Sequence, residues 1–346
     1  MSISPRHGRP LTATVAALAA VAVVAAAGSA GAWGAAGHRL IGYLAVKTLP
    51  DDLPGFVRGA ASDVGELARE PDRTKGSGKL HDEMREGNHF IDLDDNAQAG
   101  LAGGGPSIDA LPPTRQLYDD ALRAHGATLT QAGWLPYSIT DSYYDLVTDY
   151  ALWRIARVGE HRARSREHRS WFARDRKRRE ALILEDMGEL AHFVGDGSQP
   201  LHTTIHFNGW GPFPNPRGFT TEKIHQPFEG TFVYTYIKPQ DVVPAMGLYA
   251  PCEADRLACV AAYLKASNSL TVRFYELEQA GAFRDGDARG KAFAIDRLAA
   301  GATQLRNMYV DAWRASATAE VGWPKVKVSD VEAQGLDAYD SLFGKD

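Results

Sequence analysis

The strongest chemical signal in the sequence is a histidine and an aspartate four residues apart, followed closely by a second histidine. His192 and Asp196 end a periodic helical stretch, so both side chains project from one helix face and can reach the same metal ion. Gly197 and Pro200 are expected to end that helix, which lets His202 approach from another direction. Asp196 has two oxygens and could bridge two ions. Taken alone, the pair indicates no more than a polar helix end.

Further nitrogen and oxygen donors are spread along the chain. His225 and Glu229 are again four residues apart, and Pro227 between them is compatible with a helix that begins near His225. His89 follows one charged loop, and Asp72 is expected in a second loop. Histidine and carboxylate donors without thiolates suit zinc in catalytic sites that keep water bound.

Residues 1–32 have the pattern of a cleaved signal peptide. Two arginines precede an apolar run over 11–27, and the small residues 30–32 supply a cleavage site. The alternative is a membrane anchor, but the run is short and no basic stop-transfer cluster follows it. Cleavage would leave Trp33 as the N-terminus, where its α-amine and carbonyl could chelate a metal ion with His38 within reach. We therefore expect an exported protein, either periplasmic or secreted.

Helical periodicity dominates the stretches that must position these donors. Apolar residues recur every three or four positions over 35–49, 143–158 and 182–194, and further helices are expected at 115–125, 255–280, 289–317 and 329–342. The best candidate strand is Thr231–Ile237, and loops rich in Gly, Pro and Asn lie at 95–113 and 207–221. No repeat or linker divides the chain. The sequence predicts one all-α domain over 33–346, with long loops around a metal cleft.

Composition narrows the range of functions. With 44% apolar residues and a net charge of −5, the chain is neither disordered throughout nor globally basic. Between 154 and 179, however, the sequence has eleven Arg or Lys and only three acidic residues. This excess of positive charge predicts a solvated helical protrusion or, alternatively, a patch that binds a polyanion. Two cysteines exclude a disulfide-dense scaffold. In an oxidising compartment Cys252 and Cys259 could close a small loop, and a reduced pair remains the alternative.

Several motifs together resemble the S1/P1 nuclease family and its superfamily relative, the zinc-dependent bacterial phospholipase C. They are Trp33-Gly-x-x-Gly-His38, Pro71-Asp72-Arg73, His89-Phe90 and His192-Phe-x-Gly-Asp196-x-x-Gln-Pro-Leu-His202, in the order of the family. Mature members begin with tryptophan, which agrees with cleavage before Trp33. The C-terminal third has no motif that we can match. The resemblance implies a helical fold of the phospholipase C/P1 nuclease type.

The resemblance also implies three zinc ions per chain. One ion would be held by Asp72, His89, His192 and Asp196, a second by His202, His225 and Glu229, and a third by the amine and carbonyl of Trp33 with His38 and Asp196. Asp72 would in addition orient the attacking water or take its proton, with ligation alone as the alternative. The other histidines of the mature chain, His81, His125, His161, His168 and His206, are assigned to surface or loop roles.

The substrate is less closely defined by the resemblance. Phe90 matches a family position that stacks on a nucleobase, although an ordinary core aromatic is an equal alternative. Lys75 occupies the place of a basic residue in the nucleases and can supply charge to a phosphate. Glu229, in contrast, is closer to the phospholipase C pattern, and the aromatic loop 207–219 could rest on a lipid interface or pack as a lid.

Three functions follow from these observations. The first is an endonuclease for single-stranded DNA or RNA, with 3′-nucleotidase activity on nucleotides. The alternative is a phospholipase C that acts on phospholipid headgroups, and the third is a zinc-binding protein without turnover. We expect a monomer with no obligate protein partner.

Overall fold

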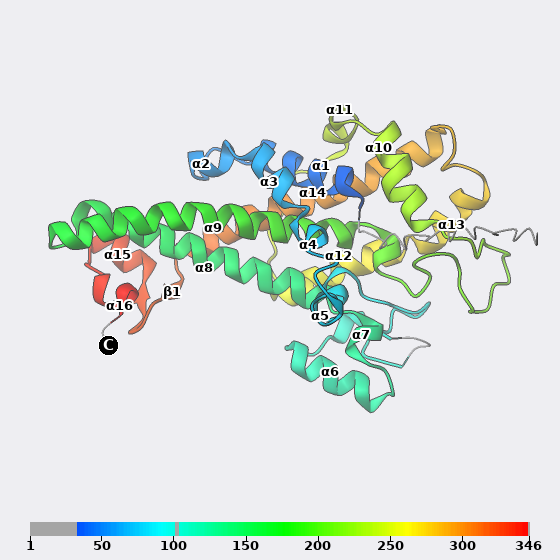
Figure 1. Ribbon diagram of the computed structural model, residues 1–346, viewed down its shortest axis with the longest axis horizontal. Helices are drawn as coiled ribbons and strands as arrows, with labels where there is room; N and C mark the ends of the chain where they lie inside the picture. Colours follow the sequence, from blue (N-terminus) through cyan, green and yellow to red (C-terminus); the bar gives the residue numbers. More distant parts are fainter. Residues whose placement is uncertain (1–32, 101–103, 345–346) are drawn as a thin grey trace, which may run out of the picture.

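The computed structural model describes residues 33–100 and 104–344, and this part of the chain is almost entirely helical (Figure 1). Its one sheet is a two-stranded antiparallel hairpin of β1 (Glu320–Val321) and β2 (Val326–Lys327). The prediction of an all-α chain is therefore confirmed for the described residues. The expected signal peptide, residues 1–32, lies outside them.

Two long antiparallel helices run through the molecule (Figure 1). They are α8 (Leu135–Arg162) and α9 (Arg166–Ser198), which pack together along their length. Pro136 lies in the first turn of α8, where a missing N–H is not needed. Ser165 begins α9, because its side chain accepts a hydrogen bond from the His168 amide at 3.0 Å. The expected helices 143–158 and 182–194 are thus parts of much longer ones.

Most of the other helices surround the inner half of this pair. Helices α1 (Ala35–Lys47), α3 (Ala61–Leu67) and α14 (Ala288–Ser316) pack against α9 and cover its apolar face. The remaining helices are short: α2 (Gly55–Arg58), α4 (Glu70–Arg73), α5 (Lys79–Glu86), α6 (Arg115–Ala124), α7 (Leu129–Ala132), α10 (Val233–Tyr236), α11 (Pro239–Val242), α12 (Arg256–Asn268), α13 (Thr271–Gln279), α15 (Val328–Gln334) and α16 (Tyr339–Phe343). Single turns are η1 (Gly87–His89), η2 (Ile108–Ala110), η3 (Pro200–His202), η4 (Pro227–Phe232) and η5 (Val243–Ala245).

The predicted strand at 231–237 is wrong. A π-helical turn, η4, occupies 227–232 and leads directly into α10. Phe228 and Phe232, four residues apart, are both buried, whereas Tyr234 is 72% exposed. Burial of residues four positions apart is the spacing of a helix. The strand was predicted from the β-branched and aromatic residues of the segment, whose preference for strands depends on their surroundings.

Other differences concern helix ends and the segments expected to be loops. The charged stretches that contain Asp72 and precede His89 form the short helices α4 and α5. Helix α9 continues through Gly197 to Ser198 before the chain turns. The expected helix 255–280 is interrupted between α12 and α13, and 329–342 is interrupted at Gly335, which has a φ of 66°.

A smaller hydrophobic core lies at the outer end of α8 and α9, away from the main core. Here α15, α16 and the β1–β2 hairpin, which we call the C-terminal lobe (residues 320–343), pack under the two long helices (Figure 1). Cys252 and Cys259 form a disulfide, which resolves the alternatives left by the sequence. No helix in the described ranges is both long and apolar enough to cross a membrane.

Candidate metal centre

The inner end of α9 supplies the centre of the site. Every residue from 190 to 206 is buried, and His192 and Asp196 are both 0% exposed. His89, from η1, approaches the same point: its Nδ1 lies 3.1 Å from Asp196 Oδ2 and 2.9 Å from His192 Nε2. His192 Nε2 is itself 3.4 Å from Asp196 Oδ2. Three donor atoms from two elements therefore converge as the spacing predicts.

Helix α1 contributes His38 to this centre. Its Nε2 lies 3.4 Å from Asp196 Oδ1, and its ring stacks on His192 with a centroid distance of 3.9 Å. Gly195 permits this approach, because a Cβ there would lie 2.9 Å from His38 Nδ1. Asp196 thus has His38 on one oxygen and His89 with His192 on the other.

Asp72 lies at the rim of the centre. Its Oδ1 is 3.9 Å from His192 Nε2, and Lys75 Nζ is 2.6 Å from the same oxygen. The Asp72 side chain is 22% exposed, unlike the other carboxylates of the site. The residue can therefore reach both the buried donors and solvent.

A second group of donors comes from η3 and the turn that begins η4. Glu229 Oε1 lies 2.8 Å from His225 Nε2 and 3.2 Å from His202 Nε2, and the two Nε2 atoms are 3.1 Å apart. Gln199 Nε2 donates to the same Glu229 oxygen at 2.7 Å. The irregular turn allows His225 and Glu229 to point in one direction, although Pro227 lies between them.

Backbone carbonyls hold three of the imidazole rings in place. The Nδ1 atoms of His192, His202 and His225 donate to the carbonyl oxygens of Ala68, His89 and Phe207, at 2.8, 2.7 and 2.8 Å. These bonds leave Nε2 of each ring directed at the centre with its lone pair free. Hydrogen bonds of this kind, made by the ring nitrogen that does not bind the ion, orient metal-ligating histidines.

The electrostatics of the site are unbalanced without a cation. Burial raises the pKa of Asp196 well above its ordinary value and lowers the pKa values of His38 and His89. Burial also lowers the pKa of His192 to about 4. For Glu229, the nearby His225 and His202 overcome the effect of burial and lower its pKa to about 2. Burial thus favours the neutral forms of Asp196 and of the three histidines beside it, and neutral imidazole is the form that binds a metal ion.

Unsatisfied atoms identify where a cation would fit. Both ring nitrogens of His38, Asp196 Oδ1 and Glu229 Oε2 are buried and lack hydrogen-bond partners. Three groups have donor atoms that all lie within 4.8 Å of one another: His38, His192 and Asp196; Asp72, His89 and His192; and His202, His225 and Glu229. The side-chain donors expected from the sequence therefore meet in one buried region, and their chemistry fits metal ions.

Trp33 is placed beside these groups through its side chain. Its ring is fully buried, and its Nε1 donates to Ser198 Oγ at 2.7 Å. Ser198 is two residues from Asp196 on α9, so the first described residue is anchored next to the centre. The free α-amine expected here requires cleavage after residue 32, which lies outside the described part of the chain.

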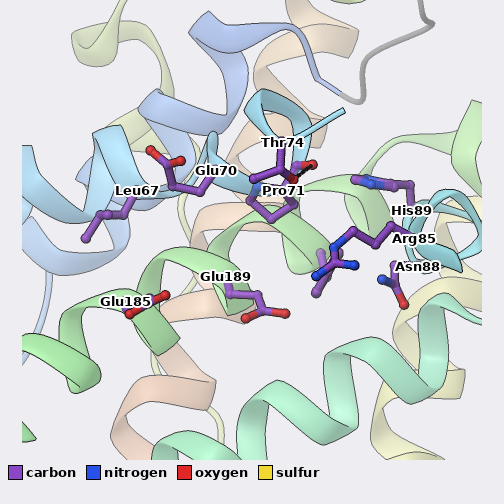
Figure 2. A pocket seen from close by; sticks show the side chains of 10 residues that line it. Leu67, Glu70, Pro71, Thr74, Arg85, Asn88, His89, Glu185 and Glu189 are labelled. Carbon is purple, nitrogen blue, oxygen red and sulfur yellow. Dashed lines mark hydrogen bonds between the residues drawn. The ribbon is translucent and has the colours of Figure 1, made fainter. Parts of the chain in front are cut away.

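Two pockets flank the centre. One, of about 360 Å³, is lined by Lys75, Phe90, Asp92 and Phe207 together with the candidate ligands His89, His202 and His225. The other, of about 210 Å³, lies between α4, η1 and α9, and Figure 2 shows Glu70, Glu185 and Glu189 around it with Arg85 opposite. The first pocket is partly aromatic, whereas the second has three glutamates and one arginine among its lining residues, so the two pockets differ in the chemical groups they could hold.

The sequence analysis did not predict a role in the site for Asp92 or the burial of His206. Asp92 is 5% exposed, its Oδ1 has no partner, and burial raises its pKa well above its ordinary value, although it lines the first pocket. Its position three residues after His89 is the signal that could have identified it. His206 lies in a loop as expected but not at the surface, because its ring is buried between Trp210 and Asp95.

Phe90 is half-buried and faces the first pocket, so it is not an ordinary core residue. The aromatic loop is mixed: Trp210 and Phe219 pack inside, and Phe207 is 45% exposed.

A scan of the chain against models of known protein families finds no match, and a search of curated proteins finds none.

Proposed function

We propose that this chain is an exported, zinc-dependent phosphoester hydrolase of the S1/P1 nuclease type, which cleaves phosphodiester bonds in single-stranded DNA or RNA and removes 3′-phosphates from nucleotides. The observation that carries the proposal is the convergence of three donor groups around Asp196 and Glu229. Isolated polar clusters are common, but five buried histidines and two buried carboxylates with unsatisfied atoms, beside a third carboxylate at the rim, are costly unless they bind cations.

Zinc suits the donors better than magnesium or calcium, which prefer oxygen ligands. The proposed ligands are Asp72, His89, His192 and Asp196 for one ion; His202, His225 and Glu229 for a second; and Trp33, His38 and Asp196 for a third. Bound zinc would supply a hydroxide-like nucleophile near neutral pH and neutralise charge on a phosphoryl group.

Residues in and around this ligand set would transfer the proton and bind the substrate. Asp72, being partly exposed, would orient the attacking water and take its proton. Lys75 would place positive charge near a phosphate oxygen. Phe90 and Asp92 line the adjacent pocket, where the ring would stack on a base and the carboxyl group would hydrogen-bond to its edge.

A phospholipase C is the second candidate, and a specific observation favours it. Leu80 and Met84, on the side of α5 turned to solvent, are 74% and 65% exposed, and α5 connects Asp72 to His89. Apolar side chains next to a metal centre are suited to a lipid interface. Glu229 also matches the phospholipase C pattern. A zinc-binding protein without turnover is the third candidate.

Parallel assays on the mature chain beginning at Trp33 test these candidates. The zinc-loaded protein should hydrolyse single-stranded DNA and RNA, and its metal content should approach three zinc ions per chain. Hydrolysis of phosphatidylcholine alone would replace the first candidate by the second, and no hydrolysis of any substrate would favour the third. No more than one tightly bound zinc would contradict the cluster itself.

A chain with one additional residue before Trp33 tests the third ion separately. Because the extension removes the chelating amine from its position, zinc content should fall by about one ion per chain. Unchanged zinc content would show that Trp33 is not a ligand, and the other two sites would be unaffected by that result.

A further inference from the structure

The outer end of the α8–α9 pair carries a concentration of positive charge that the proposed chemistry does not use. Part of this charge is neutralised locally. Arg154 pairs with Glu332, Arg176 pairs with Glu160, and Arg179 pairs with Asp149. These arginines have a structural role, because each joins two elements of the fold.

Three other cations form a stripe along α9. Arg166, Arg174 and Lys177 are exposed, and none of them forms an ion pair within the described ranges. At 100° per residue they fall within an arc of about 80°, so they lie on one side of the helix. With a rise of about 1.5 Å per residue the stripe is about 17 Å long.

The C-terminal lobe adds exposed aromatic rings at one edge of this stripe, because Trp171, which contacts the lobe, lies three residues before Arg174 on α9. Trp171 of α9 packs edge-on against Phe343 of α16, with ring centroids 5.9 Å apart. Phe343 is itself 58% exposed, and Trp323 in the β1–β2 turn is 83% exposed. The Trp323 amide donates to the Ser341 carbonyl, so the turn is held against α16. Rings of this kind offer stacking surfaces for unpaired bases.

We infer that this outer end is a second binding site, which holds single-stranded nucleic acid through its phosphates on the Arg166–Lys177 stripe and through a base on Trp323. Proteins that bind single strands without sequence preference combine a row of cations with aromatic rings on which bases stack. An anionic membrane is the less suitable partner. The described residues 154–179 have no exposed large apolar side chain, and the exposed ones of the lobe, Trp323, Leu336 and Phe343, come from three separate segments. They do not form the continuous apolar helix face that an interfacial helix inserts.

The inferred site is distinct from the metal centre. Arg166 and His192 are 26 residues apart on one helix, which separates them by about 39 Å. Glu185 and Glu189 lie between them and would repel phosphates. The outer site would therefore retain a long strand without contacting the bond that is cleaved. This inference goes beyond the proposed hydrolysis and does not depend on it.

Binding of a labelled phosphorothioate oligothymidylate of about 30 nucleotides to the zinc-loaded protein tests the inference. This probe keeps its backbone charge and resists hydrolysis, and its length is checked after each measurement. The triple variant R166Q/R174Q/K177Q should bind about tenfold more weakly, and the slope of log affinity against log salt should fall by about 2. W323A should weaken binding by a similar factor without changing that slope.

The matched control is K238Q/R273Q/R284Q, which removes the same charge from exposed positions at the opposite end of the molecule. It should bind like the parent, and hydrolysis of a dinucleotide should be the same in all variants. Equal binding by the R166Q/R174Q/K177Q variant and the parent would overturn the inference, and so would equal weakening by the control. Binding to phosphatidylserine vesicles without binding to the oligonucleotide would replace nucleic acid by a membrane surface.

Discussion

The two ends of α9 carry charge in opposite ways. At the inner end, residues 190–198 are all buried. His192 and Asp196 lie there among buried polar atoms that have no hydrogen-bond partner. At the outer end, most charged side chains are exposed or paired with a carboxylate of a neighbouring element. The same helix therefore combines a polar cluster that needs a ligand with a charged surface that is stable in water.

This difference shows which kind of charge carries functional information. An exposed arginine is solvated, and its presence demands little explanation. A buried carboxylate without a partner costs several kcal/mol, roughly, unless a cation or proton compensates it. Asp196, which is 0% exposed with one oxygen unpartnered, is for this reason stronger evidence for a ligand than all eleven cations of the outer end.

The largest effect is expected from Asp196→Asn. The amide keeps the shape of the side chain but removes the charge that would bridge two ions, so phosphodiester hydrolysis should fall about 1,000-fold or more. Zinc content, measured by elemental analysis of the same sample, should fall with it. Arg174→Gln, at the outer end of the same helix, is the matched control and should retain full hydrolysis of a dinucleotide. Full activity of the Asp196→Asn variant would remove the distinction between the two ends.

A smaller effect is expected from Gln199→Leu, because Gln199 orients the proposed ligand Glu229 and is not itself a proposed ligand. Its side chain donates to Glu229 Oε1, and its loss should reduce zinc affinity about 10–100-fold. Competition with a chelator at fixed pH measures that affinity. Gln116→Leu provides an exposed comparison and should leave affinity unchanged. If both variants bind zinc like the parent, the hydrogen bond does not orient Glu229.

The inner end was also the part of the molecule that the sequence predicted best. The convergence of His192 and Asp196 could be predicted from their four-residue spacing, because residues four apart on a regular helix project from the same face. His202 and His225 were predicted as donors, but their convergence depends on turns whose geometry no periodicity describes. The all-α class followed from apolar repeats, whereas helix lengths and the turn at 227–232 were decided by tertiary packing.

Other features were beyond sequence reasoning for a different physical reason. Asp92 and His206 are buried polar residues on irregular segments, and burial of such segments depends on contacts with residues far away in the chain. The aromatic rings beside the basic stripe come from the C-terminal lobe, more than 140 residues beyond it, as the separation of Trp171 from Trp323 shows. Long-range contacts of this kind leave no local pattern.

Packing gives a third comparison within α9. A Cβ at Gly188 would lie 2.4 Å from Leu67 Cβ and 2.8 Å from the Leu67 carbonyl carbon, so helices α3 and α9 touch there. Gly188→Ala should lower the free energy of unfolding by about 1–3 kcal/mol, as overpacking does. Gly55→Ala has no atom within 4 Å of its new Cβ and should be neutral or slightly stabilising. Denaturant titration measures both, and equal stability of the two variants would contradict the close contact.

The smallest effect is expected from a carboxyl group between the two ends. Burial, together with Asp149, Asp145 and Glu189, raises the pKa of Asp186 from 3.8 to about 8. The protonated form therefore stabilises the fold at acidic pH, and this contribution is lost as the pH rises through about 8. Asp186→Asn should behave like the parent near pH 5 and be more stable by about 1 kcal/mol near pH 9, because solvent screens a partly exposed group.

Denaturant titration of both proteins at the two pH values checks this last prediction. Any effect of pH on metal binding is common to the variant and the parent, so only the difference between them reports on Asp186. Asp175→Asn, at the outer end, is the contrasting variant: Asp175 is paired with Arg178 at 3.0 Å, and its loss should destabilise rather than stabilise at high pH. A gain of stability in both variants would mean that acidic charge is unfavourable along the whole helix. A gain confined to Asp186→Asn would show that the middle of α9 holds carboxylates which neither a cation of the protein nor the solvent fully compensates.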